Sequence, residues 1–268
     1  MMPELAKERI WPVKTNNWTA ENVTRDQPRA QTATTPSLQT FRWQLADGAT
    51  VGLALVAATQ RLTSNGADSP KLDSEVLLGH VLGWTRAQIY AHPERLLTED
   101  ERKRLERLVI RRCQNEPVAY LVGEKAFYGL DLMVDPRVLI PRPETELLVD
   151  MVLDVALQYD ELRANGRNGS KPAAGRFLVA DIGTGSGAVA VAVAANTEAT
   201  FIYAVDISAD ALEVAQGNAQ RHGLQARIRF MQGDLLTPLP EPVDVIAANL
   251  PYVTANEWDD LAPGIVDF

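Results

Sequence analysis

The last third of the sequence alternates short apolar runs with stretches of helical periodicity, and this alternation restricts the fold more than any other feature. The apolar runs that predict buried strands lie at 177–183, 200–206, within 226–234 and within 242–252. Helical patterns follow the first two, starting at Gly187 and Ser208. Strands and helices that alternate at this spacing form a parallel, doubly wound α/β sheet with ligands at the carboxyl ends of its strands.

The chain before residue 177 predicts three further parts. Residues 1–45 are read as a disordered tail, because the stretch from Lys14 to Thr40 has almost no large apolar side chains. Residues 46–117 show helical periodicity and predict a small helical domain, in which His80 is expected to pack in the core. A hairpin linker is predicted over 118–140, with its turn at Tyr128-Gly129, and residues 141–268 form the start of the α/β domain. This last part opens with a helix near Pro143 and continues through a flexible loop at 164–175.

The charge balance and the rare residue types exclude several classes of protein. The 26 basic and 35 acidic side chains give a net charge of −9, which opposes nonspecific coating of nucleic acid. A single cysteine, Cys113, cannot form an intramolecular disulfide, and the three histidines lack metal-ligand spacing, so no metal is predicted. No apolar stretch suits a signal peptide or a membrane span, so we expect a cytoplasmic protein without a membrane partner.

A glycine-rich turn follows the first predicted strand, where a ligand must approach the backbone at a helix start. Gly183, Gly185 and Ala188 fit the G-x-G-x-x-G/A fingerprint of nicotinamide-dinucleotide folds, and Asp206 lies where such folds place a ribose-binding acid. Asp181 at the end of that strand favours a different cofactor. Its carboxylate would repel a pyrophosphate but attract the sulfonium and ammonium groups of S-adenosylmethionine.

The sequence therefore predicts a binding site for S-adenosylmethionine. In this interpretation the glycine turn passes under the methionine portion, Asp206 accepts hydrogen bonds from the ribose hydroxyls, and Asp234 or Leu235 borders the adenine. The predicted cofactor-binding residues are Asp181, Gly183, Thr184, Gly185, Ser186, Gly187, Asp206, Asp234, Leu235 and Asn249.

The segment Asn249-Leu250-Pro251-Tyr252 ends the fourth predicted strand and suggests the chemistry. An amide or exocyclic amino nitrogen is a poor nucleophile, because its lone pair is delocalised into a π-system. The side-chain carbonyl of Asn249 and a neighbouring backbone carbonyl can accept hydrogen bonds from its two N–H groups. Pro251 would fix that backbone, and Tyr252 would offer an aromatic face to a planar group. We predict Asn249 as the catalytic residue, the whole segment as the substrate site, and in-line methyl transfer to nitrogen as the reaction.

Four stretches together resemble the release-factor glutamine N5-methyltransferases, the HemK/PrmC-like family. They are AYLVGEKAFYGLDLMVDPRVLIPRPETELLVD, DIGTGSGAVAVAVA, AVDISADALEVAQGNA and NLPYV. The resemblance implies a helical amino-terminal domain for substrate recognition over 46–117, a hairpin linker and a seven-stranded Rossmann-like methyltransferase domain. It also implies that residues 183–187 and Asp206 bind the methyl donor, and that residues 249–252 bind a glutamine. That glutamine belongs to the Gly-Gly-Gln motif of a peptide-chain release factor, the implied partner. Arg142 and Glu144 have two interpretations, an approach to the cleft or an ordinary helix start.

The sequence departs from the family pattern in two places. Leu250 stands where the motif usually has its first proline, which predicts a looser turn with the same chemistry. The sequence ends at Phe268, soon after the fourth strand, so we expect a truncated chain with about four of seven strands and an apolar edge at the strand ending at Ala248.

Three alternatives remain open at this point. An adenine-N6 methyltransferase acting on nucleic acid uses the same Asn-x-Pro-Tyr chemistry, although the net charge and the missing basic stripe oppose it. A nicotinamide-dependent oxidoreductase would use the same glycine turn. A noncatalytic binding fragment would keep affinity for a release factor without turnover. The leading hypothesis is a monomeric protein-glutamine methyltransferase that needs no direct contact with nucleic acid.

Overall fold

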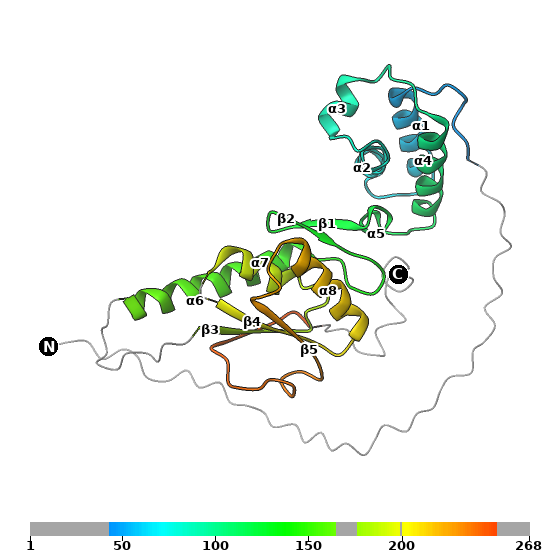
Figure 1. The fold of residues 1–268 in the computed structure, drawn as a ribbon. Coiled ribbons are helices and arrows are strands. Elements are labelled where there is room, and N and C mark those ends of the chain that lie inside the picture. The colour runs from blue at the N-terminus through cyan, green and yellow to red at the C-terminus, as the bar shows by residue number, and fades with distance from the viewer. Residues whose placement is uncertain (1–42, 165–175, 199, 251–268) are drawn as a thin grey trace, which may run out of the picture. The chain divides into compact units, whose positions relative to one another are not determined.

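The computed structural model describes residues 43–164, 176–198 and 200–250 of the chain (Figure 1). The first part contains five helices and a hairpin: α1 (Val51–Ser64), α2 (Pro70–Leu82), α3 (Arg86–Ala91), α4 (Glu99–Arg112), α5 (Val118–Val122), β1 (Glu124–Phe127) and β2 (Leu130–Met133). The second part contains η1 (Pro143–Thr145), α6 (Glu146–Ala164), β3 (Phe177–Ile182), α7 (Ala188–Asn196), β4 (Thr200–Asp206), α8 (Ala209–Arg221), β5 (Ile228–Gln232) and β6 (Val245–Ala248). Residues 1–42 of the predicted tail and residues 165–175 of the predicted loop at 164–175 lie outside the described residues, and Ala164 ends α6.

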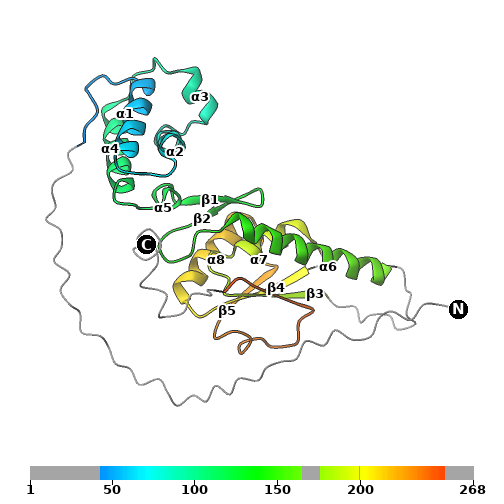
Figure 2. The same ribbon diagram turned by 180° about the vertical axis from the view of Figure 1, so that it is seen from behind.

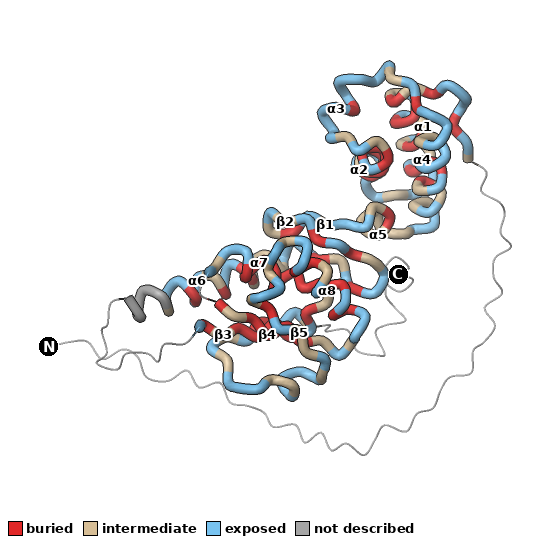
Figure 3. Tube along the Cα trace, viewed as in Figure 1, coloured by how far each residue is buried: buried red, intermediate tan, exposed pale blue. Residues whose placement is uncertain are grey.

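The helical part has a core of its own, and local signals in the sequence start its helices. Thr98 accepts a hydrogen bond from the backbone of Glu101, whose side chain in turn caps Thr98, so α4 begins with a capping box. The same arrangement starts α3 at Thr85. Apolar residues of α1, α2 and α4 meet in one buried cluster. Figure 3 marks the buried positions of these helices in red. The helical prediction is confirmed.

Three details of the helical part differ from the sequence-based expectations. Leu45, assigned to the tail, is buried in the core cluster of the helical part, and its backbone N–H donates to buried Glu106 at 2.8 Å. His80 is exposed rather than packed in the core. The inner face of α2 instead carries the acidic side chains of Asp73 and Glu75, which are held by Arg112 and Arg86. The short helix α5 was not anticipated, and it occupies residues assigned to the hairpin linker.

The hairpin forms where its turn residues predict it. β1 and β2 are antiparallel, with Phe127 paired with Leu130 across a two-residue turn. Tyr128 and Gly129 both have positive φ, 50° and 75°, which is the conformation of a type I′ hairpin turn. Phe127 and Leu132 are buried in the same cluster as the α/β domain's helices and strands. The hairpin is therefore part of the α/β core as well as a connection.

The remaining strands form one parallel sheet in the order β5-β4-β3-β6. Two views related by a half turn show α6, α7 and α8 on the same face of this sheet (Figures 1 and 2). Alternating residues of β3 separate the two faces: Val179 packs in the helix-covered cluster, whereas Ala180 and Ile182 pack with Val205 and Leu239 in another. The predicted parallel α/β fold and its four strands are confirmed.

The strand order places the carboxyl ends of β3, β4 and β6 side by side. Ile182 pairs with both Val205 and Ala248, and Asp206 pairs with Gln232, so the segments that follow these strands start at one edge of the sheet. β6 ends the row among the described strands, and its Ile246 is exposed. Within the described ranges, none of the helices combines the length and apolar character that a membrane-spanning segment requires.

Candidate active site

The glycine-rich turn joins β3 to α7 through three glycines with positive φ. These angles are 69° at Gly183, 53° at Gly185 and 77° at Gly187, in the left-handed region that favours glycine. At two of these glycines, close packing is a second reason why no larger residue fits. A Cβ on Gly187 would lie 3.0 Å from the Ala215 Cβ, and one on Gly183 would lie 2.6 Å from the Leu250 side chain. A Cβ on Gly185 would meet open space, so this part of the turn leaves room beside the backbone for a ligand.

Asp181 is buried beneath the turn, and its carboxylate holds the turn in place. Its Oδ2 accepts a hydrogen bond from Thr184 Oγ1 at 2.6 Å and one from the Ala190 backbone N–H at 3.1 Å. Burial raises the pKa of Asp181 to about 6, against the opposing effect of these two hydrogen bonds. The residue thus orders the start of α7. The additional attraction between Asp181 and a cationic methyl donor stays a prediction.

Asp206 lies at the end of β4 and contacts the turn directly. Its Oδ2 accepts a hydrogen bond from the Gly185 N–H at 2.8 Å, and its Oδ1 accepts one from the Ser208 N–H at 3.0 Å. An ionised carboxylate offers about four acceptor positions, so a group with these two bonds can also accept from hydroxyls. This position, next to the open side of Gly185, suits the predicted contact with a ribose.

Asp234 and Leu235 follow β5 at the same edge of the sheet. The Gly233 N–H donates to the Asp206 carbonyl oxygen at 3.0 Å, which brings this loop to the end of β4. Leu235 has a φ of 47° and is half exposed, an unusual combination for a residue with a bulky side chain. Strained backbone of this kind is concentrated at ligand sites, which agrees with the prediction that Leu235 borders the adenine.

Asn218 on α8 joins the turn to the hairpin, and the sequence reasoning missed it. Its side chain is fully buried, and Nδ2 donates to the carbonyl oxygens of Ser186 and Met133, both at 2.9 Å. Its Oδ1 accepts a hydrogen bond from the Met133 N–H at 2.6 Å. The signal available in the sequence was an amide side chain at helical spacing from the apolar residues Val214, Ala215 and Ala219.

The substrate end of the site begins directly after β6. Ala248 pairs with Ile182, so Asn249 lies next to the start of the glycine turn, and its side-chain Nδ2 donates to Thr145 Oγ1 at 2.9 Å. Leu250 packs with Ile182 in the cluster on the far face from the helices. The side chain that replaces the usual proline is therefore a packing residue. Pro251 and Tyr252 of the predicted substrate site lie outside the described residues.

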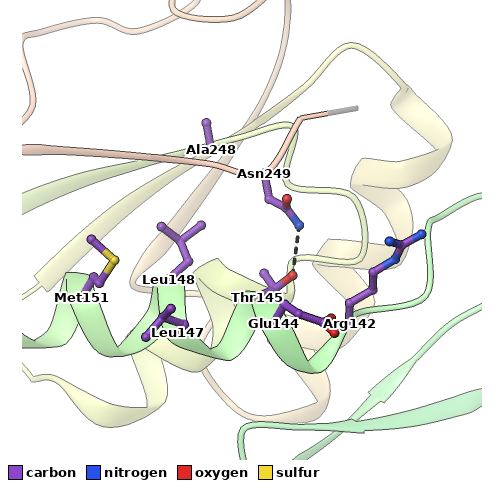
Figure 4. A pocket seen from close by; sticks show the side chains of 8 residues that line it. All are labelled: Arg142, Glu144, Thr145, Leu147, Leu148, Met151, Ala248 and Asn249. Atoms are coloured by element: carbon purple, nitrogen blue, oxygen red, sulfur yellow. Dashed lines mark hydrogen bonds between the residues drawn. The ribbon is translucent and has the colours of Figure 1, made fainter. Parts of the chain in front are cut away.

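A cavity of about 320 Å³ opens between the start of α6 and the end of β6. Its polar side is formed by Arg142, Glu144, Thr145 and Asn249, and its apolar side by Leu147, Leu148, Met151 and Ala248 (Figure 4). Arg142 and Glu144 were predicted either to approach the cleft or to serve only as a helix start. Their position in the cavity wall favours the first interpretation. Arg142 also caps η1, so its backbone serves the helix start at the same time.

The three acids near the turn favour one kind of cofactor. Asp181, Asp206 and Asp234 all lie at the carboxyl ends of neighbouring strands, and a phosphate placed among them would be repelled. A ligand with hydroxyls and positive charge is compatible with the same residues. The fold and this site define a methyltransferase of the Rossmann-like class.

Two family models match the chain in agreement with this class. The PrmC N-terminal domain matches residues 54–123, and a methyltransferase domain matches residues 177–261. The chain belongs to the release factor glutamine methyltransferase family, as the resemblance in the sequence indicated.

Relatives named "Release factor glutamine methyltransferase" match over most of the chain. Those from Koribacter versatilis and Chlorobaculum tepidum are each 40% identical to it, over 82% and 72% of this chain. The relative from Rhodopirellula baltica is 38% identical, over 82% of this chain. The matched regions cover 73%, 64% and 71% of these three relatives, in the same order. Among solved structures, a ribosomal protein L11 methylase from Lactobacillus delbrueckii subsp. bulgaricus is 26% identical over 44% of this chain and 51% of that chain, with a TM-score of 0.32.

Proposed function

We propose that the protein transfers a methyl group from S-adenosylmethionine to the side-chain amide nitrogen of a glutamine in a peptide-chain release factor. The observation that carries this proposal is the position of Asn249, which lies beside the glycine turn and on the rim of the cavity. The target is the glutamine of the release factor's Gly-Gly-Gln motif. Family membership supports the same substrate, because the relatives are named for this reaction.

Bound S-adenosylmethionine supplies an electrophilic methyl group on a sulfonium. Residues 183–187 would hold its methionine portion, Asp206 its ribose, and Asp234 with Leu235 its adenine. The nucleotide fingerprint Gly183-x-Gly185 is shared with nicotinamide enzymes, but the methyltransferase match over residues 177–261 decides against that alternative.

The chain's own residues act on the glutamine amide. The Asn249 side-chain oxygen and the backbone carbonyl of Leu250 accept the two N–H groups of the substrate, which orients the nitrogen and raises its electron density. The nitrogen forms a bond to the methyl carbon as the carbon–sulfur bond breaks, and the amide then loses one proton to water. Most of the rate enhancement comes from holding the two reacting atoms in contact and in line.

The proposal is tested by incubating the chain with methyl-labelled S-adenosylmethionine and a purified release factor. We expect label on the release factor, and none on a variant in which the Gly-Gly-Gln glutamine is replaced by alanine. Label that persists on that variant would contradict the proposed target. Parallel reactions with DNA and RNA distinguish adenine methylation, and a release factor that binds without accepting label would indicate a noncatalytic fragment.

The remaining parts of the proposal concern surroundings and assembly. The proposed location is the cytoplasm, where a substrate that acts in translation is found. We propose a monomer that recognises the release factor without direct contact to nucleic acid or a membrane. Sedimentation of the purified chain, alone and with a release factor, measures the oligomeric state directly.

A further inference from the structure

We infer that Thr145 is a positioning residue that fixes the orientation of the Asn249 side-chain amide for methyl transfer. This inference rests on the proposed function and adds a residue to it. Thr145 Oγ1 accepts the hydrogen bond from Asn249 Nδ2 at 2.9 Å, and both side chains lie on the polar side of the cavity (Figure 4). The two residues are 104 positions apart in the sequence.

The orientation matters because the two ends of an amide have opposite hydrogen-bonding roles. The oxygen of Asn249 can accept an N–H group from a substrate amide, whereas its NH₂ group would meet that N–H group as a second donor. A bond from Nδ2 to Thr145 places the nitrogen toward α6 and the oxygen on the other branch of the amide. In the structure the Thr145 hydroxyl accepts from Nδ2, and this bond holds the amide in the orientation that the proposed chemistry needs.

Thr145 can do this because the turn of η1 holds its backbone and the helix that follows it is bound to the hairpin. Its N–H donates to the Arg142 carbonyl oxygen at 3.0 Å in the turn of η1. The next residue, Glu146, accepts a hydrogen bond at 2.9 Å from the backbone N–H of Tyr128 in the hairpin turn. The Tyr128 hydroxyl also donates to Asp150 Oδ1 on α6 at 2.6 Å. Threonine itself is branched at Cβ, which restricts its side-chain rotation.

The test compares two replacements of Thr145 that differ in the hydroxyl. Thr145→Val keeps the shape and removes the hydroxyl, and Thr145→Ser keeps the hydroxyl with less bulk. We expect kcat for release-factor methylation to fall about tenfold in Thr145→Val, as the loss of one hydrogen bond at a reacting group implies. Thr145→Ser should recover most of this loss, and the KM for S-adenosylmethionine should stay within about twofold in both variants.

Two further measurements separate positioning from packing and from direct substrate contact. Thr63→Val makes the same chemical change on the exposed face of α1, where Thr63 Oγ1 donates to the Thr59 carbonyl oxygen, and it should leave kcat unchanged. In an Asn249→Ala background, Thr145→Val should cause no additional loss, because its partner is already gone. An additional loss there, equal losses in the valine and serine variants, or a wild-type kcat in Thr145→Val would each overturn the inference.

A spectroscopic readout keeps this inference separate from the proposed function. In chain labelled with ¹⁵N at asparagine, the Asn249 side-chain NH₂ signals are assigned by their loss in Asn249→Ala. We expect Thr145→Val to shift these signals and to speed their exchange with solvent, and Thr145→Ser to leave them close to wild type. Unchanged signals in Thr145→Val would overturn the inference even if methylation is detected. Absence of methylation in wild type, with the expected shifts present, would count against the proposed function alone.

Discussion

The cofactor side and the substrate side of the site are built differently. On the cofactor side, the carboxylates of Asp181 and Asp206 and the amide of Asn218 are bonded to backbone or hydroxyl groups of the turn, and Asp181 and Asn218 are buried. On the described part of the substrate side, Asn249 is exposed, and the cavity wall includes Leu147, which is 64% exposed. A small cofactor can bind to a surface that the chain orders by itself. A protein substrate can bring its own surface to cover an open one.

The strongest way to separate the two sides is to remove the amide of Asn249. We expect Asn249→Ala to lower kcat about 100- to 1,000-fold, the usual loss when a preorganised group at the reacting centre is deleted. The dissociation constant for S-adenosylhomocysteine, measured by calorimetry, should change less than about threefold. A parallel loss of cofactor affinity would place Asn249 on the cofactor side, where it was also predicted to contact the methyl donor.

The cofactor side should instead respond to Asn218. Asn218→Leu leaves the buried carbonyl of Ser186 and the N–H and carbonyl of Met133 without their side-chain partner. We expect the free energy of unfolding to fall by about 3 kcal/mol and the affinity for S-adenosylhomocysteine to fall about tenfold. Urea unfolding and calorimetry measure the two effects.

A matched control for this change lies at the end of α7. Asn196 is exposed, and its Nδ2 bonds to the Ala192 carbonyl oxygen at 2.9 Å within one helix. Asn196→Leu should alter the free energy of unfolding by no more than about 0.5 kcal/mol. Equal effects of the two substitutions would mean that the hydrogen bonds between the hairpin, α8 and the turn do not stabilise the cofactor side.

The same contrast explains how much could be predicted from the sequence. The glycine turn, the strands and the acids at their ends follow from local patterns, because each depends on residues within one strand–turn–helix unit. Tyr128-Gly129 specified its hairpin turn for the same reason. These elements were all placed within a few residues of where the structure has them.

The parts that the sequence did not reveal depend on contacts between distant segments. Thr145 and Asn249 are 104 positions apart, and Asn218 and Met133 are 85 apart, so no local pattern pairs them. His80 was misplaced because its neighbours suggested an apolar face. Leu77 and Val81 are buried as that face requires, but the buried side of α2 continues through Ser74 and Leu78 and leaves His80 exposed.

The last prediction tests whether Asp181 only orders the turn or also attracts the cofactor. Burial raises its pKa to about 6 from the ordinary 3.8, so the folded state binds more protons than the unfolded chain between these values. The free energy of unfolding of wild type should therefore fall as pH rises from about 4 to 6, relative to Asp181→Asn, by at most about 1.4 kcal/mol per pH unit.

Glu101 in the helical part provides the control, because its contribution to the free energy of unfolding should change with pH in the opposite direction. The Arg95 guanidinium lowers the pKa of Glu101 to about 2, so the stability from this pair is present above the ordinary value of 4.5 and is lost as pH falls toward 2. Relative to Glu101→Gln, wild type should gain stability as pH rises through that window. Urea unfolding at a series of pH values measures both differences.

The decisive experiment repeats the Asp181 series with saturating S-adenosylmethionine. A sulfonium that is attracted to Asp181 favours the ionised carboxylate, so it lowers the pH up to which the free energy of unfolding falls. If the free energy of unfolding still falls up to about pH 6 with the cofactor bound, the role of Asp181 is restricted to ordering the turn.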